Sequence, residues 1–302
     1  MNKSNLNNQE RISFYNQISS NKRKSVLLIL VIILALFLLI TVIGLAFQMD
    51  IFFILIIAIV ISILYVWIGY YASDKIALAS VNAKPAEISE YKQFHDLVEG
   101  LCLASGMSKP RLFVMNDPNI NAFASGRDPK HAVICVTTGA LEKLDKQELE
   151  GVLSHELSHI ANYDIRFMTL TAVLVGMVAI ISQIFLRSLW FKGDRDDSKG
   201  NVILIIIAIV LAIFAPIVVQ LVQLAISRKR EYTADASAVK LIRSPTGLIK
   251  ALKKIKSDHS PPSKVNKAVA PLFFGDPFKR NLDNLMSTHP PLEKRIAILE
   301  RM

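Results

Sequence analysis

Apolar residues form long runs along this chain, and polar residues gather between them. Four runs have roughly the twenty residues that a helix needs to cross the hydrocarbon core of a bilayer: 25–47, 51–71, 167–190 and 202–226. Three of these carry no charge, whereas the run 167–190 contains Arg187 and several polar residues. That run is also compatible with an amphipathic helix lying partly on protein. We expect two transmembrane hairpins, 25–71 and 166–226.

The segment between the two hairpins, 72–165, has the shorter periodicities of a globular part. Apolar residues at three- and four-residue spacing predict a helix over 88–105. Runs bounded by turn signals predict three short strands, at 111–115, 121–126 and 132–140. Because so small a sheet needs helices to cover it, this segment is expected to form an α+β minidomain.

The helix that follows these strands has a clear start. Asp145 and Glu148 have the spacing of a capping box, in which each side chain accepts the other residue's backbone N–H. Leu144 and Leu149 flank the box and can form the hydrophobic staple that accompanies it. His155 then lies in the third turn, well inside the helix, and is therefore rigidly placed.

The stretch HELSH, at 155–159, gives this helix its candidate chemistry. Residues four apart project from one face of a helix, so His155 and His159 can bind one ion through their imidazole nitrogens. Glu156 projects about 100° further round the helix and can reach a metal-bound water without binding the metal. The alternative is a polar helix face with two solvated histidines, which the specificity of the motif and its helical context disfavour.

A catalytic zinc ion usually has three protein ligands and one open position, so one ligand must come from elsewhere. Glu231 is the candidate, because a membrane hairpin at 166–226 would bring its two ends together and return Glu231 to His159. Asp235 shares a helix face with Glu231 and is suited to hold the second nitrogen of a ligating histidine. Asn162 and Asp164 could serve the same role, but a polar helix end at a membrane surface explains them equally well. The alternative is that Glu231 and Asp235 form a solvated acidic face.

Composition and charge narrow the class of protein. Hydrophobic residues make up 52% of the chain, and the mean hydropathy is +0.39. The net charge of +10 is not arranged as a basic face with interleaved aromatics, so no nucleic-acid partner is expected. Basic residues instead flank the apolar runs, at Lys22–Lys24 and Arg228–Arg230, which predicts cytoplasmic termini and a cytoplasmic active site. Cys102 and Cys135 fit no metal or redox spacing and are expected to be unpaired thiols.

Four stretches together resemble the HtpX family of bacterial membrane zinc metalloproteases, relatives of the CAAX prenyl endopeptidases: HELSHIANYD, SRKREYTAD, NAFASG and THPPLEKRI. The resemblance implies quality control of misfolded or damaged membrane proteins at the cytoplasmic side of the cell membrane. It implies one Zn²⁺ per chain, bound by His155, His159 and Glu231, with catalysis by Glu156 and support from Asp235.

The expected fold is an α+β membrane protein with four transmembrane helices and a cytoplasmic zincin-like minidomain containing a small antiparallel or mixed sheet. The chain is expected to divide into five parts. Residues 1–24 form a cytoplasmic tail, residues 25–71 the first hairpin, and residues 72–165 a catalytic part with the HExxH helix. Residues 166–226 form the second hairpin, and residues 227–302 a catalytic part with the third ligand.

The expected mechanism follows from these parts. Zinc polarises the scissile carbonyl and activates water, and Glu156 takes the proton of the water and passes it to the departing amine. The developing oxyanion needs a further donor, for which His289 is the candidate. The alternative for His289 is a surface position before a Pro-Pro helix start.

Substrates are expected to be membrane proteins or unfolded polypeptides, bound through their backbones. The stretch NAFASG has the small uncharged residues of an edge strand open to an extended peptide. The residues expected to run alongside the substrate are Asn121, Ala122, Phe123 and Ala124. The rival interpretation is an ordinary interior strand.

Other interpretations stay open at this point. One is a prenyl-protein-type membrane endopeptidase, and another is a membrane receptor or transporter with structural zinc. The segment 247–258 is a helix that either packs on the catalytic part or lies against anionic lipid. The segment 260–291 is either a lid over the cleft or a surface loop.

Overall fold

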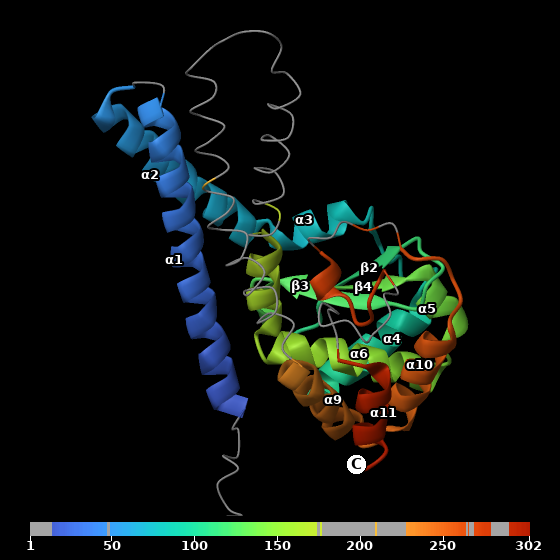
Figure 1. Ribbon diagram of the computed structural model, residues 1–302. Helices are drawn as coiled ribbons and strands as arrows, with labels where there is room; N and C mark the ends of the chain where they lie inside the picture. The colour runs from blue at the N-terminus through green and yellow to red at the C-terminus, as the bar shows by residue number, and fades with distance from the viewer. Residues whose placement is uncertain are drawn as a thin grey trace, which may run out of the picture.

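The structure of the protein, shown in Figure 1, is a computed structural model. It describes residues 14–46, 49–173, 176, 209, 228–263, 265, 269–278 and 290–302. Most of the apolar run 167–190 and nearly all of the run 202–226 lie outside the described residues, so the second transmembrane hairpin stays a prediction.

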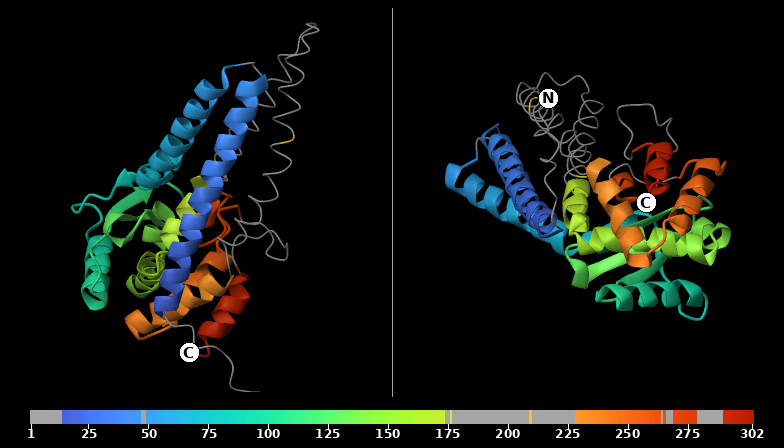
Figure 2. Two further views of the ribbon diagram at one scale, coloured as in Figure 1. Left: turned by 90° about the vertical axis from the view of Figure 1, so that its left-hand side faces the viewer. Right: turned by 90° about the horizontal axis from the view of Figure 1, so that it is seen from below.

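Two long helices run along one side of the molecule (Figure 1, Figure 2). α1 (Phe14–Ala46) and α2 (Ile51–Tyr71) are antiparallel, and the side chain of Asp50 caps the first N–H groups of α2. Within the described residues these are the two helices long and apolar enough to cross a membrane, with the apolar stretch of α1 at Ile18–Thr41. Because α1 begins well before position 25, its lower end passes α2 and lies beside the globular part (Figure 1).

The globular part is built on a four-stranded sheet: β1 (Lys84–Pro85), β2 (Arg111–Met115), β3 (Ala122–Gly126) and β4 (Ala132–Thr137). The spatial order is β1-β2-β4-β3, with β2 and β4 parallel and the other pairs antiparallel. The sheet is therefore mixed, as expected, and the strand over 111–115 is confirmed. β1 has two residues, too few to show a sequence pattern. β3 lies at one edge of the sheet, which excludes the interior position that was its alternative.

Helices and turns cover both faces of the sheet. α4 (Lys92–Ser105) and α6 (Lys146–Ala161) lie on one face, and α3 (Ser73–Ser80) and the 3₁₀ turn η2 (Ala270–Leu272) on the other. Side chains of β4 alternate between the two cores: Ile134 and Val136 join the α6 side, while Val133 and Cys135 join the α3 side. Both cysteines are free thiols, as expected.

The helix expected over 88–105 begins four residues later, at Lys92. Residues 87–91 form a turn instead, in which the N–H of Tyr91 donates to the carbonyl of Glu87 at 2.9 Å. The buried residues of the helix begin at Phe94, beyond this turn, and Tyr91 at the end of the turn packs against the same core.

The strand expected over 132–140 is wrong in its last three residues, 138–140. β4 ends at Thr137, whose side chain accepts the N–H of Ala140 at 3.1 Å and caps the short helix α5 (Thr138–Lys143). The threonine pair at 137–138 continues the β-branched pattern of the strand, but the first hydroxyl serves as a helix cap.

Three more helices complete the globular part: α9 (Arg228–Ile242), α10 (Thr246–Ser257) and α11 (Leu292–Leu299). α10 crosses α6 with the two backbones in contact, because a Cβ added to Gly151 would lie 2.5 Å from the nitrogen of Leu248. Three lysines of α10 are in ion pairs: Lys253 with Glu300, Lys254 with Glu148, and Lys256 with Glu293. α10 therefore packs on the catalytic part.

Candidate metal centre and active site

The capping box predicted for α6 is confirmed, and it fixes the start of the helix that carries the site. The N–H of Glu148 donates to the side chain of Asp145 at 2.8 Å, and the N–H of Asp145 donates to the side chain of Glu148 at the same distance. α6 is buried on nearly every side, and His155 and His159 are 0% and 4% exposed. Both imidazoles are thus held on a rigid element inside the protein.

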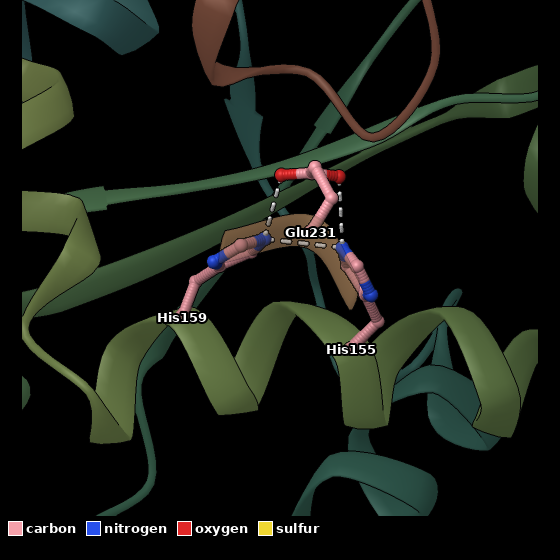
Figure 3. A group of neighbouring side chains, drawn as sticks. All are labelled: His155, His159 and Glu231. Atoms are coloured by element: carbon pink, nitrogen blue, oxygen red, sulfur yellow. Dashed lines mark hydrogen bonds and ion pairs between the residues drawn. The ribbon is translucent and has the colours of Figure 1, made fainter. Parts of the chain in front are cut away.

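Glu231, in the first turn of α9, places its carboxylate over the two histidines (Figure 3). The Nε2 atoms of His155 and His159 are 3.1 Å apart, and the oxygens of Glu231 lie 3.6 and 3.4 Å from them. Ligands arranged tetrahedrally about 2.0–2.1 Å from a zinc ion lie about 3.4 Å from one another. Within the described residues this is the cluster suited to a metal ion, and its donor set and spacing fit zinc.

A buried ion pair orients His155. Asp235, one turn beyond Glu231 on α9, lies 2.9 Å from the Nδ1 of His155. The guanidinium of Arg295 on α11 donates two hydrogen bonds to the same carboxylate, at 2.6 and 2.9 Å. Arg295 is 0% exposed and lies over the ring of Phe274. Burial raises the pKa of the Asp235 carboxyl, but the charge of Arg295 and the contact with His155 outweigh it and lower the pKa.

His159 has its own carboxylate partner, Asp164, whose Oδ2 lies 3.0 Å from the Nδ1 of His159. Burial lowers the pKa of His159, but the bonds to Asp164 and Glu231 outweigh it and raise the pKa to about 10. A metal ion bound at this position would take the place of a proton on the Nε2 of His159. Asn162, expected in this orienting role, instead ends α6, and its carbonyl accepts a bond from Asn21.

Glu156 lies beside the ligand cluster and is 1% exposed. Burial raises the pKa of its carboxyl, the charges of His155 and His159 lower it, Glu231 raises it, and the N–H of Ala124 on β3 lowers it; the net shift is upward. A carboxylate with a raised pKa at this position is suited to accept and return a proton near neutral pH. The contact with Ala124 places the general-base candidate against the edge of the sheet.

The edge of β3 is partly covered by the chain itself. The carbonyl of Ala122 accepts the N–H of Phe274 at 2.7 Å, and Phe273 forms a β-bridge with Phe123. The side chain of Asn121 holds this covering segment in place through two hydrogen bonds to Gly275. It donates to the carbonyl of Gly275 at 2.9 Å and accepts the N–H of Gly275 at 3.0 Å. The expectation of a wholly open edge over 121–124 is therefore wrong at Asn121 and Ala122.

His289, the candidate oxyanion donor, lies outside the described residues. Arg295 was not singled out in the sequence, although a signal exists. It shares its helix face with Leu292, Ile296 and Leu299, so a charged residue occupies a position of the apolar stripe.

Comparison with known proteins places this site in a family. Residues 89–302 match peptidase family M48. A protein named Protease HtpX homolog from Caldanaerobacter subterraneus subsp. tengcongensis is 46% identical over 246 residues, 80% of this chain and 82% of that protein. Proteins of the same name from Dictyoglomus thermophilum and Ligilactobacillus salivarius are 42% and 38% identical, over 96% and 95% of this chain and 95% and 99% of theirs. The crystal structure of S. mikatae Ste24p is similar at a TM-score of 0.48 and 21% identity, covering 94% of this chain and 66% of that chain.

A peptidase family match across the HExxH helix and the third carboxylate makes this a membrane metalloprotease. The chain belongs to peptidase family M48 and, within it, to the HtpX proteases. The resemblance of the sequence motifs is thereby confirmed. The alternative of a receptor or transporter with structural zinc finds no support in a family of peptidases.

Proposed function

We propose that this protein is a zinc-dependent endopeptidase that cleaves misfolded or damaged membrane proteins at the cytoplasmic side of the cell membrane. The observation that carries the proposal is the convergence of His155, His159 and Glu231, whose ligand atoms all lie within 4.8 Å of one another. Two nitrogens and a carboxylate around one position, with a further buried carboxylate beside them, form the donor set of catalytic zinc sites.

Each side chain has a distinct role in the proposed reaction. His155, His159 and Glu231 would hold the zinc ion, which would supply a Lewis acid for the scissile carbonyl and for a bound water. Glu156 accepts the proton of the attacking water and returns it to the leaving amine. Asp235 holds the Nδ1 of His155, which keeps the Nε2 of that ring directed at the ligand cluster.

The substrate backbone is proposed to lie along β3 at Ala124. This residue supports the role because its N–H is directed at Glu156, so a peptide paired here lies against the general base. Asn121, Ala122 and Phe123 then act indirectly, since they hold the segment that includes Phe273 and Gly275 at one end of the edge. Main-chain pairing reads side chains weakly, which suits unfolded substrates of varied sequence.

Cytoplasmic placement rests on the basic residues that flank the apolar runs, and it has a direct test. A cysteine introduced by Lys199→Cys, in the loop of the second proposed hairpin, is expected to react with a membrane-impermeant reagent from outside. A cysteine introduced by Leu103→Cys, at a position 79% exposed on α4, is expected to react from the cytoplasmic side. Cys102 and Cys135 are buried and give a low background. Labelling of both positions from one side would contradict the arrangement.

The catalytic proposal is tested by Glu156→Gln in the full chain in detergent micelles. We expect zinc stoichiometry to stay at about one per chain, while cleavage of an unfolded membrane-protein substrate falls about 100-fold or more. Glu150→Gln changes a half-exposed carboxylate of the same helix and is expected to leave cleavage unchanged. Retained cleavage by the Glu156→Gln variant would contradict the proposed role of this carboxylate.

A further inference from the structure

The lower end of the membrane helix α1 enters the hydrogen-bond network of the metal centre. Asn21 is 4% exposed, and its Nδ2 lies 3.0 Å from the carbonyl of Asn162 and 2.7 Å from the Oδ1 of Asp164. Both partners are acceptors, so the amide nitrogen with its two N–H groups must face them. Asn21 therefore commits both donors to the turn that follows α6.

Asp164 connects this contact to a ligand of the site. Its Oδ2 lies 3.0 Å from the Nδ1 of His159, while its Oδ1 receives Asn21 and lies 3.2 Å from the Nε of Arg230. A carboxylate on Nδ1 keeps the imidazole proton there and turns Nε2 toward the metal position. Asp164 is 0% exposed, so its orientation is set by the groups that surround it, and Asn21 is one of them.

The rest of α1 supports the same docking. Asn21 and Ser25 continue the buried stripe of the helix, which is formed further up by Leu28 and Ile32. This stripe packs against Phe167, three residues after Asp164. Figure 1 shows the lower end of α1 level with α9, well below the end of α2.

The turn that Asn21 holds has an unusual backbone. Tyr163 has a φ of 58°, in the left-handed region that a bulky residue rarely adopts. Lys22 lies over its ring, with Nζ 4.4 Å from the centroid. Two neighbouring residues of α1 thus hold one strained turn, Lys22 through the ring of Tyr163 and Asn21 through Asp164.

We propose that Asn21 is a positioning residue of the metal centre, through which the first membrane helix holds Asp164 in place behind His159. The inference rests on the proposed zinc-dependent function. It makes α1 a part of the catalytic unit as well as a membrane anchor, because one of its side chains determines how well a ligand is oriented.

The test measures zinc and cobalt binding, without proteolysis, by the full chain in detergent micelles. Asn21→Ala is expected to weaken zinc affinity about tenfold. This is the lower end of the range of losses expected when a group that supports a metal ligand is removed. The visible absorption of bound Co²⁺, which reports ligand geometry, is expected to change as well. Ser25→Ala is the matched control, since Ser25 is 1% exposed and its hydroxyl donates only to the carbonyl of Asn21 on its own helix. We expect it to keep both properties.

A double variant shows whether Asn21 acts through Asp164. When Asp164→Ala is already present, adding Asn21→Ala is expected to leave zinc affinity unchanged. If Asn21→Ala does not fold, Asn21→Ser replaces it, because the shorter hydroxyl cannot span both acceptors. Wild-type affinity and cobalt spectrum in a folded Asn21 variant, or a further tenfold loss in the double variant, would overturn the proposal. Because no cleavage is measured, these outcomes are independent of the protease assay of Glu156→Gln.

Discussion

Arg295 and Asp235 form a bidentate ion pair, and neither residue is more than 1% exposed. The carboxylate is shared, since it also lies 2.9 Å from the Nδ1 of His155. A buried pair of charges contributes little net stability, but removing one partner leaves the other charge unpaired in the interior. The pair therefore gives the site a fixed geometry, and its disruption is costly.

Arg295→Ala is expected to destabilise the protein by about 3–5 kcal/mol, because Asp235 is left buried without its guanidinium partner and keeps only the contact with His155. Arg295→Lys keeps the charge but cannot form two parallel bonds, so it is expected to recover only part of the loss. Thermal unfolding of the metal-free protein measures both. Lys253→Ala breaks the exposed pair with Glu300 and is expected to cost less than about 1 kcal/mol. Equal effects of the buried and exposed changes would contradict this account.

Glu231→Ala is expected to abolish stoichiometric zinc binding, because it removes one of three ligands. Asp235→Asn is expected to keep the ion but weaken its affinity about 10- to 100-fold, since it acts on the orientation of His155. Metal analysis after dialysis against graded chelator concentrations separates the two results. Glu293→Gln, a change of an exposed carboxylate on α11, serves as the control and is expected to bind zinc normally. Full zinc occupancy in Glu231→Ala would mean that the third ligand lies elsewhere.

Acid should weaken the contact of Asp258, at the end of α10, with α5 and with the loop that precedes β3. Burial raises the pKa of Asp258, but bonds from Ser260, Lys143 and the N–H of Ile120 outweigh it and lower the pKa to about 2. A depressed folded-state pKa contributes stability above the unfolded value of about 3.9, and that contribution is lost as the pH falls toward 2. The stability difference between wild type and Asp258→Asn is therefore expected above pH 4 and should shrink as the pH falls from 4 to 2.

Thermal unfolding of both proteins between pH 2 and pH 7 checks this prediction. A difference that stayed constant over the whole range would show that Asp258 makes no charge-dependent contribution.

Gly151→Ala is expected to destabilise the protein by about 1–3 kcal/mol, since the added methyl group meets the backbone of Leu248 where α10 crosses α6. Gly100→Ala provides the matched control within a helix. A Cβ at Gly100 has no atom within 4 Å, and alanine is the better helix former, so this variant is expected to gain up to about 1 kcal/mol. Thermal unfolding is expected to show that Gly151→Ala lowers the stability and Gly100→Ala raises it. If both variants were destabilised, the cause would be a general effect of replacing glycines in helices.

The HExxH helix was predictable because it follows from local rules, whereas the position of Glu231 was predicted from the topology of the two apolar runs that separate it from His159. The capping box and the four-residue spacing are visible in adjacent residues, and Asp235 follows from its spacing to Glu231 on one helix. The strand at 111–115 was predictable for the same reason. The end of β4 was not, because Thr137 satisfies a strand pattern and a helix cap equally well.

Arg295 and Asn21 were missed because each is a polar residue on a helix whose partners lie far away in the sequence. Each nevertheless occupies a buried stripe, Arg295 among apolar residues of α11 and Asn21 below those of α1. A charged or amide side chain at a stripe position is expensive to bury without a partner, so it indicates a specific contact. The partners themselves, Asp235 and Asp164, could be identified only once the helices were placed in space.

The residues of the metal centre are synthesised at widely separated times, so the site can be completed only late in the synthesis of the chain. The ribosome makes Asn21 first and the two histidines much later, and Glu231 and Arg295 follow later still. A growing chain therefore carries the HExxH helix for a long time without the third ligand or the ion pair that holds His155. Because the site draws on such distant positions, the ligand cluster can form only after most of the chain has been made.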